Sequence, residues 1–151
     1  MSARATHRTR PASTARTYVL DRQVGFILRQ VVQRHIGIFT ERMLAELTPT
    51  QFAALAKLFE VGPCSQNRLG RLTAMDAATI KGVIDRLTKR GFTQVRPDAR
   101  DARLLMVHLT LKGRRIARTA IREALQITEE TLAPLRVREQ AELLKLLRKL
   151  C

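Results

Sequence analysis

The sequence predicts a mainly α-helical fold: a winged helix-turn-helix with a small β-hairpin wing, and flanking N- and C-terminal helices that form a dimerisation region. Three observations predict it. Apolar residues recur at the helical period over most of the chain, two short capped helices follow each other closely, and one segment alternates as strands do. We expect a single domain over residues 18–151. Within it, residues 48–110 form the winged helix-turn-helix lobe, and residues 18–46 with 111–151 form the dimerisation helices.

Two helices are expected before the helix-turn-helix. Apolar residues recur on one broad stripe over residues 24–43, which suits a helix packed against more than one neighbour. The next helix has a strong start signal. Thr48 can cap it, Pro49 occupies the first helical position, and Gln51 completes a capping box. A Gly-Pro pair ends this helix after "LFEV".

The helix-turn-helix itself is expected from Ser65 to Gly91. Ser65 can cap the short helix "QNRLGRLT", with Leu69 and Leu72 facing inward. After the turn "TAMD", Asp76 can cap a second helix that Gly91 ends. The apolar positions expected on the buried face of this second helix are Ile80, Val83, Ile84 and Leu87.

The segments "FTQV" and "LLMVHL" are expected to be antiparallel strands joined by the loop "RPDARDAR", with Leu105, Val107 and Leu109 on one face. From Thr110 the helical period returns in a long helix, which Pro134 ends before a last amphipathic helix. A row of leucines near the C-terminus needs a partner surface, and this indicates a homodimer. The row is Leu143, Leu144, Leu146, Leu147 and Leu150.

The net charge of +15 predicts a polyanionic partner, because each phosphate that a cation neutralises releases condensed counterions. Basic residues without acids gather in residues 112–122 and in residues 1–17, which we expect to be a disordered basic tail. A merely solvated basic surface is the alternative. The chain has neither an apolar signal core nor a run of about 18 apolar residues. We therefore expect a cytoplasmic protein and no membrane partner.

The loop "RPDARDAR" predicts a charged wing beside the helix-turn-helix. An arginine at a wing tip is attracted to a narrow minor groove, and we expect Arg100 to have this role. Asp98, Asp101 and Arg103 are expected to brace the wing, with help from Arg86 of the second helix, because a carboxylate can fix a neighbouring guanidinium. An ordinary charged turn is the alternative.

The stretch "RPDARDARLLMVHLTLKG" holds the pattern Asp-x-Arg-Asp-x-Arg followed by apolar residues and Leu-Thr-x-x-Gly. Together with "LTPTQFAALAKL" and "SQNRLGRLTAMDAATIKGVIDRLTKRG", it closely resembles the MarR family of bacterial regulators over roughly residues 20–150. The resemblance implies a dimeric DNA-binding protein, usually a repressor that a small aromatic carboxylate or phenol releases from its operator. It also implies a bacterial protein that is associated with the nucleoid when bound to DNA. The sequence of these stretches is most similar to that of members that control breakdown of aromatic or N-heteroaromatic acids, such as nicotinate-pathway repressors.

The resemblance also implies which residues face DNA. On the second helix these are Ala77, Ala78, Thr79, Lys81 and Gly82. Thr79 can bind a base or a phosphate, and Lys81 can reach guanine or a phosphate. Gly82 departs from many relatives, and either permits close approach to DNA or reduces the number of base contacts. The phosphate-binding residues expected at the start of the preceding helix are Ser65, Gln66 and Asn67.

An effector pocket is expected around His35 and Arg42, which could hold a planar aromatic carboxylate against Phe39, Phe52 and Leu55. A core histidine with a surface arginine is the alternative reading.

Rival functions are a thiol-oxidation switch and a nonspecific nucleoid-type DNA-binding protein. The switch would use Cys64, whose pKa a helix N-terminus could lower. The scattered histidines and cysteines have no metal-ligand spacing, so we expect no metal and no cofactor. No catalytic constellation is visible, and we expect no enzyme.

Overall fold

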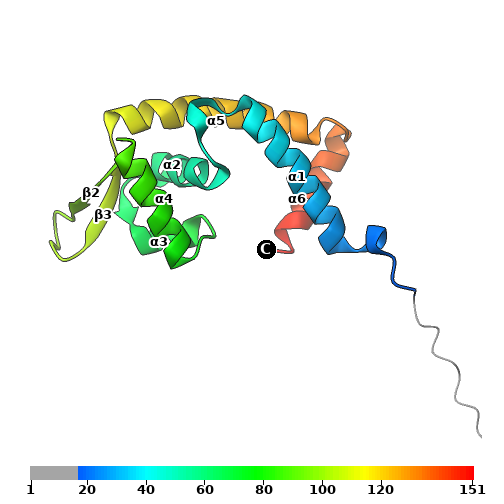
Figure 1. Ribbon diagram of the computed structural model, residues 1–151, viewed down its shortest axis with the longest axis horizontal. Coiled ribbons are helices and arrows are strands. Elements are labelled where there is room, and N and C mark those ends of the chain that lie inside the picture. Colours follow the sequence, from blue (N-terminus) through cyan, green and yellow to red (C-terminus); the bar gives the residue numbers. More distant parts are fainter. Residues whose placement is uncertain (1–16) are drawn as a thin grey trace, which may run out of the picture.

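The computed structural model describes residues 17–151, so the predicted basic tail lies outside the described residues except for Thr17. In chain order the elements are η1 (Leu20–Arg22), α1 (Val24–Arg42), η2 (Leu44–Glu46), α2 (Pro49–Val61), β1 (Cys64–Ser65), α3 (Gln66–Leu72), α4 (Ala77–Lys89), β2 (Thr93–Pro97), β3 (Leu105–Leu109), α5 (Leu111–Leu132) and α6 (Val137–Arg148). The winged helix-turn-helix lies at one end of α5, and α1 and α6 lie at the other (Figure 1). The predicted fold class is confirmed.

The predicted helix starts are confirmed by their capping hydrogen bonds. Thr48 and Gln51 form both halves of a capping box at α2. The Ser65 hydroxyl accepts a hydrogen bond within the first turn of α3, and the Asp76 carboxylate accepts one from the Thr79 amide at 2.7 Å at the start of α4. These local signals fix where the helices of the lobe begin, because each satisfies amide groups that the helix itself leaves unpaired.

The core of the lobe lies where α4 packs against α2 and α3. The four apolar residues predicted for the inner face of α4 are all buried. Leu69 of α3 is buried too, but Leu72 is 41% exposed, so its predicted inward position is wrong. The reason is that burial on this short helix is centred between Leu69 and Gly70, and Leu72 lies beyond that face.

Gly70 allows α3 and α4 to approach each other closely. A Cβ at this position would lie 3.0 Å from the Met75 carbonyl oxygen and 3.2 Å from Cγ2 of Ile80. The Gly70 carbonyl accepts a hydrogen bond from the Met75 amide at 2.9 Å, which closes the turn between the helices. The angle between the two helices therefore depends on a residue without a side chain.

The wing belongs to a three-stranded antiparallel sheet of order β1-β3-β2, not to the isolated two-stranded hairpin predicted from the sequence. The added strand, β1, pairs Cys64 with Val107. Strand β2 also continues to Pro97, which shortens the predicted loop. Of the apolar face predicted on β3, Val107 is buried but Leu105 is exposed, because the hairpin projects beyond the lobe at that end (Figure 1).

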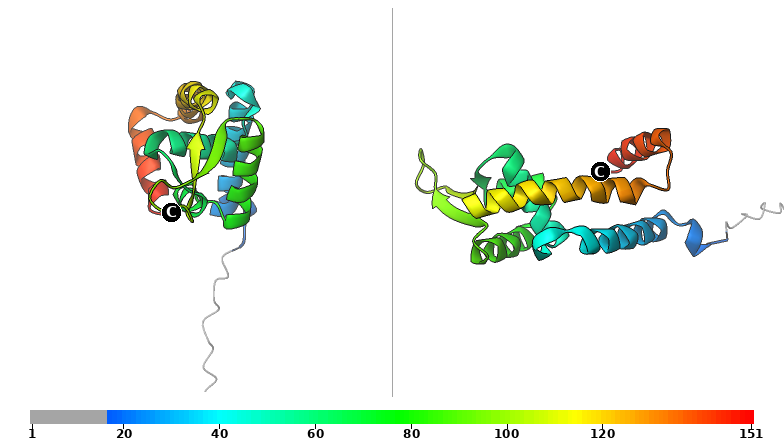
Figure 2. Two further views of the ribbon diagram at one scale, coloured as in Figure 1. Left: turned by 90° about the vertical axis from the view of Figure 1, so that its left-hand side faces the viewer. Right: turned by 90° about the horizontal axis from the view of Figure 1, so that it is seen from above.

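Helix α5 joins the two ends of the molecule. Its buried side packs against both α2 and α1, and seen from above it runs between α6 and α1 (Figure 2). Thr110 fixes its start: the side chain accepts a hydrogen bond from the Gly113 amide and donates one to the Gly91 carbonyl at 2.6 Å. The end of α4, the base of the wing and the start of α5 therefore form one junction.

Apolar side chains remain exposed on the helices far from the wing. On α1 they form the stripe predicted from the sequence. At α6, Leu144, Leu146 and Leu150 belong to the predicted leucine row, with Leu150 just beyond the end of the helix, and Val137 at its start is exposed as well. The exposed residues of the α1 stripe are Val24, Ile27, Leu28, Val31, Val32 and Ile36. No helix among residues 17–151 is both long enough and apolar enough to span a bilayer.

Candidate DNA-binding surface and effector site

The exposed face of α4 carries the residues predicted to enter the major groove. Ala77, Ala78, Thr79 and Lys81 are exposed, and Gly82 is partly covered. The Lys81 ammonium forms an ion pair with Asp85 at 2.7 Å, one helical turn away. The structure thus brings the predicted residues together on one surface, but the Lys81 ammonium is already paired with the Asp85 carboxylate.

The predicted phosphate-binding residues lie at the N-terminus of α3, close to β1. The Ser65 hydroxyl accepts a hydrogen bond from the Arg68 amide at 3.4 Å, Gln66 is partly buried and Asn67 is exposed. Their position leaves amide groups of the first turn directed out of the helix, where an anion would be favoured.

In the wing, the acidic side chains hold the backbone. The Asp98 carboxylate accepts hydrogen bonds from the amides of Arg100 at 2.8 Å and Asp101 at 3.2 Å, and Asp101 accepts one from the Arg103 amide at 3.0 Å. The loop is closed by a hydrogen bond from the Asp98 amide to the Leu104 carbonyl at 2.7 Å. The amide hydrogen bonds, first that of Arg100, lower the pKa of the Asp98 carboxyl below its ordinary value.

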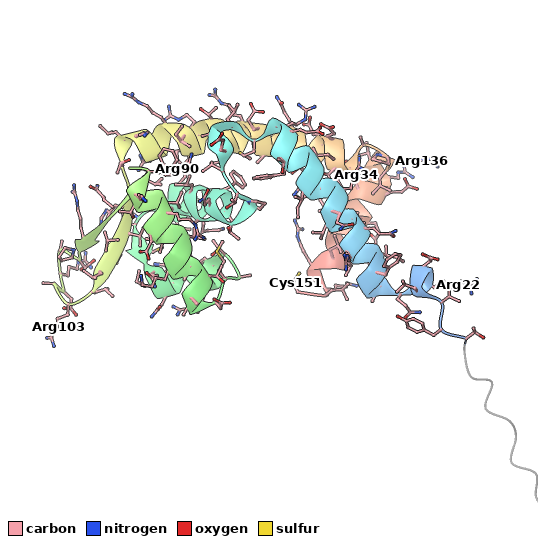
Figure 3. All side chains as sticks on the ribbon, in the orientation of Figure 1. Arg22, Arg34, Arg90, Arg103, Arg136 and Cys151 are labelled. Carbon is pink, nitrogen blue, oxygen red and sulfur yellow. The ribbon has the colours of Figure 1, made fainter. Side chains whose placement is uncertain are left out.

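Two details of the predicted bracing need correction. Arg103 does form the expected ion pair with Asp101, at 3.7 Å, but its side chain extends from the wing tip and is almost fully exposed (Figure 3). Arg86 does not brace the wing: its guanidinium lies over Gly82 on α4 itself. The carboxylates therefore order the loop through amide groups, and this leaves the guanidinium groups of Arg100 and Arg103 at an exposed tip.

His35, the centre of the predicted effector pocket, faces α5. Its Nδ1 lies 2.9 Å from the Thr131 hydroxyl, which itself donates a hydrogen bond to the Ile127 carbonyl at 2.7 Å. Because the hydroxyl proton is used in this way, the Thr131 oxygen can accept a hydrogen bond from the His35 tautomer that carries its proton on Nδ1. Thr131 was not predicted from the sequence, because nothing in the local pattern relates residues that are so far apart in the chain.

The other predicted pocket residues divide between core and surface. Phe39 packs edge-on against Phe52, with ring centroids 6.0 Å apart, and Leu55 is completely buried. Arg42 forms an ion pair with Glu130 of α5 on the exposed side of the molecule. The two aromatic rings therefore pack together, whereas the Arg42 guanidinium is paired with the Glu130 carboxylate.

Two cavities, each of about 320 Å³, flank this cluster. The first lies between α1 and α2 and is lined by Phe39, Thr40, Met43, Glu46, Leu47, Thr48 and Pro49. The second lies between α1, α5 and α6 and is lined by Val31, Val32, His35, Thr128, Thr131, Leu132, Leu143, Leu144 and Leu147. His35 and Phe39 thus open onto different cavities, one turn apart on the same helix.

Cys64 lies inside the sheet. It is completely buried in β1, and this burial raises the pKa of its thiol above the ordinary value, while Arg68 opposes the shift only weakly. The sequence-based expectation that a helix N-terminus lowers this pKa is wrong, because desolvation is the larger effect.

Arg90, at the C-terminal end of α4, is a further residue that the sequence did not single out. Its guanidinium donates hydrogen bonds to the carbonyls of Ala45 and Glu46, both of which have positive φ angles, 58° and 48°. It also stacks on the Phe92 ring, 4.7 Å from the ring centroid. The end of α4 is therefore tied to the segment that connects α1 to α2 and that lines the first cavity.

Comparison with known proteins agrees with this geometry. The MarR family model matches residues 47–105, the part that holds α2, α3, α4 and most of the wing. The chain is 38% identical to the HTH-type transcriptional repressor NicR of Pseudomonas putida, over 99% of this chain and 95% of that protein. The chain belongs to the MarR family.

Solved structures extend the similarity of this MarR-family chain. A probable transcriptional regulator from Pseudomonas aeruginosa is 51% identical, with a TM-score of 0.85, covering 88% of this chain and 100% of that one. BpsR of Bordetella bronchiseptica, whose DNA binding is regulated by 6-hydroxynicotinic acid, is 38% identical, with a TM-score of 0.83 and coverage of 88% and 96%. This MarR protein is a transcriptional regulator and not an enzyme.

Proposed function

We propose that the protein is a homodimeric repressor that binds a pseudo-palindromic operator in the bacterial cytoplasm and is released by a small aromatic or heteroaromatic carboxylate. The observation that carries the proposal is the combination of two surfaces on one chain. One end presents α4 and an ordered, arginine-tipped wing, and the other end leaves a long apolar stripe uncovered.

The uncovered stripe supports a dimer with α1 and α6 at its centre. A single chain leaves the large apolar side chains of these two helices in water, and each buries favourably against a second copy. A two-fold axis there places two α4 helices on successive major grooves, about 34–36 Å apart. The operator would then have two related half-sites.

In this arrangement each part of the lobe contacts a different part of the DNA. Helix α4 contacts base edges, the N-terminus of α3 contacts phosphate, and Arg100 and Arg103 reach the neighbouring minor groove. The basic charge supplies affinity on any sequence, whereas the base contacts and the groove shape supply the preference for an operator.

The effector proposal rests on His35 and on the relatives. 6-Hydroxynicotinic acid, which regulates DNA binding of BpsR, is a heteroaromatic carboxylate. We place such an effector in the cavity between α1, α5 and α6, with its carboxylate at His35, whereas Phe39 opens onto the other cavity. An effector there contacts α1 and α5, and a change in the packing of these helices would change the spacing of the two α4 helices. A coupling of about 1–3 kcal/mol lowers operator affinity from several-fold to more than a hundredfold.

The DNA half of the proposal is tested by competition between an operator and random duplex at fixed salt. The operator is first selected from a random duplex library. We expect a preference of at least about 10³-fold, as for specific regulators. Equal binding of both duplexes would instead support a nonspecific nucleoid-type protein.

The effector half is tested by operator release with 6-hydroxynicotinic acid and related acids, for the wild type and for His35→Ala. We expect His35→Ala to blunt the response and to leave DNA binding intact, whereas Arg42→Ala, whose guanidinium is already paired, should respond as the wild type does. Release by peroxide alone, abolished by Cys64→Ser, would replace the acid by a thiol switch.

A further inference from the structure

The centre of the exposed face of α4 is almost bare. Ala78 and Gly82 lie one helical turn apart on this face, and neither has a side chain beyond Cβ. Arg86 lies one further turn along the same face and is exposed. The part of the helix directed towards a groove is therefore a shallow trough, and one arginine stands at its C-terminal end.

The Arg86 side chain fills this trough. Side chains on a helix point back towards its N-terminus, so the guanidinium reaches over the preceding turn. A Cβ at Gly82 would lie 3.4 Å from Nη1 of Arg86, 3.7 Å from Nη2 and 3.8 Å from Cζ. The guanidinium group thus crosses the helix directly above the glycine. An added Cβ would be in ordinary van der Waals contact with it, so only a side chain that extends beyond Cβ would displace it.

The two cations that flank Gly82 differ in their availability. The Lys81 ammonium is held by Asp85 at 2.7 Å, and this carboxylate would repel a phosphate or a base carbonyl close to it. For the Arg86 side chain, no ion pair or hydrogen bond is found within residues 17–151. Arg86 therefore keeps its planar fork of donors unused on the exposed face.

We propose that Arg86, and not Lys81, forms the specific hydrogen bonds to a guanine in each half-site. Gly82 leaves the space in which the Arg86 guanidinium is positioned. An arginine fork donates two parallel hydrogen bonds to O6 and N7 of guanine in the major groove, which no other base accepts in the same way. The glycine lets the fork lie close to the helix axis, so that α4 can enter the groove deeply. This inference rests on the proposed function, because it requires an operator.

The test uses the full-length protein and the selected operator, in which each G·C pair of both half-sites is replaced symmetrically by A·T. Affinities of wild type, Arg86→Ala, Arg86→Lys and Lys81→Ala are measured at one salt concentration. For the wild type we expect a roughly 10- to 100-fold loss at one symmetric pair of positions. Both Arg86 variants should bind that altered operator as well as the original one, while their preferences at all other positions persist. Arg86→Lys keeps the charge and loses only the fork.

Gly82→Leu tests the role of Gly82 separately from stability. Leucine is a better helix former than glycine, so we expect a Tm equal to or above that of the wild type, together with a several-fold weaker guanine preference at the same positions, because its side chain extends beyond Cβ. Gly82→Ala is the matched control and should keep the preference, since its Cβ fits in van der Waals contact. An unchanged guanine preference in Gly82→Leu would contradict the role of Gly82.

Uniform loss by Arg86→Ala on every operator variant would overturn the proposal, and so would loss of the guanine preference in Lys81→Ala. A wild type that shows no preference for its selected operator over random duplex would contradict the proposed function itself, which separates the two failures.

Discussion

The wing loop shows how acidic residues stabilise a surface that binds a polyanion. The carboxylates of Asp98 and Asp101 accept hydrogen bonds from backbone amides of the loop, so their oxygens face inward. The sequence predicted that these acids order the wing, but it suggested guanidinium partners. Charge pattern alone does not distinguish the two, since an aspartate two residues before an amide can bind that amide as readily as it binds a nearby arginine.

At residue scale we predict that Asp98→Ala weakens operator binding several-fold, because the Arg100 and Asp101 amides lose their acceptor. Asp98→Asn should bind nearly as the wild type does, since its side-chain oxygen can accept the same two hydrogen bonds. Fluorescence anisotropy with labelled operator measures both. Equal weakening in both variants would assign the effect to lost charge instead of loop order.

The pH dependence of the wing follows from the lowered pKa of Asp98. A carboxyl whose pKa is lower in the folded state stabilises that state above its unfolded pKa, and this contribution is lost as the pH falls through the lowered folded value. We expect the protection factors of the Arg100 and Asp101 amides, that is, their exchange rates relative to those of an unstructured peptide at the same pH, to fall in that acidic range and to stay constant between pH 6 and 8. Protection factors that fall near neutral pH would contradict this assignment.

At the scale of elements, local signals predicted more than long-range ones. The capping residues Thr48, Ser65 and Asp76 specify helix starts through neighbours three residues away, which sequence alone displays. The two-residue strand β1 and the contact between Arg90 and η2 depend on residues more than forty positions apart, and no periodicity reports them. The ion pair between Lys81 and Asp85 is different: the two residues are four positions apart on α4, so this spacing is visible in the sequence, although it was not predicted.

Arg90 links α4 to the connection between α1 and α2. We predict that Arg90→Ala lowers the free energy of unfolding by about 1–3 kcal/mol, because partly buried carbonyls lose charged donors. Thermal and urea unfolding measure this loss. Ala45→Gly is the control: at φ 58° glycine relieves backbone strain, so stability should not fall. A stable Arg90→Ala protein would show that the connection holds its conformation unaided.

Gly113 is the point where α5 crosses the base of the wing. A Cβ there would lie 1.8 Å from the Phe92 carbonyl oxygen, so the backbones must separate. We predict that Gly113→Ala destabilises the protein by roughly 3 kcal/mol, near the upper end for overpacked sites. Gly82→Ala, the same change on an exposed helix face of the same lobe, should be neutral or stabilising. Unfolding curves for the pair test the junction directly, and a Gly113→Ala protein as stable as Gly82→Ala would contradict it.

For the whole molecule, the exposed stripe on α1 predicts an obligatory second copy. We expect Ile27→Glu to produce a monomer in light scattering and to lose most operator affinity, because a charge would be buried at the apolar interface. Leu111→Glu changes a more exposed apolar residue at the other end of the molecule, where no partner is expected, and should remain dimeric. A dimeric Ile27→Glu protein would place the interface elsewhere.

The central claim is that two copies of this chain hold two α4 helices on successive turns of one duplex. Hydroxyl-radical footprinting on the selected operator, with the stoichiometry of the same complex from sedimentation, tests it most directly. We expect two chains per duplex and two symmetric protected regions whose centres lie about 34–36 Å apart, flanked by minor-groove protection from the wings. One chain per duplex, or protection that is uniform along the DNA, would contradict the account.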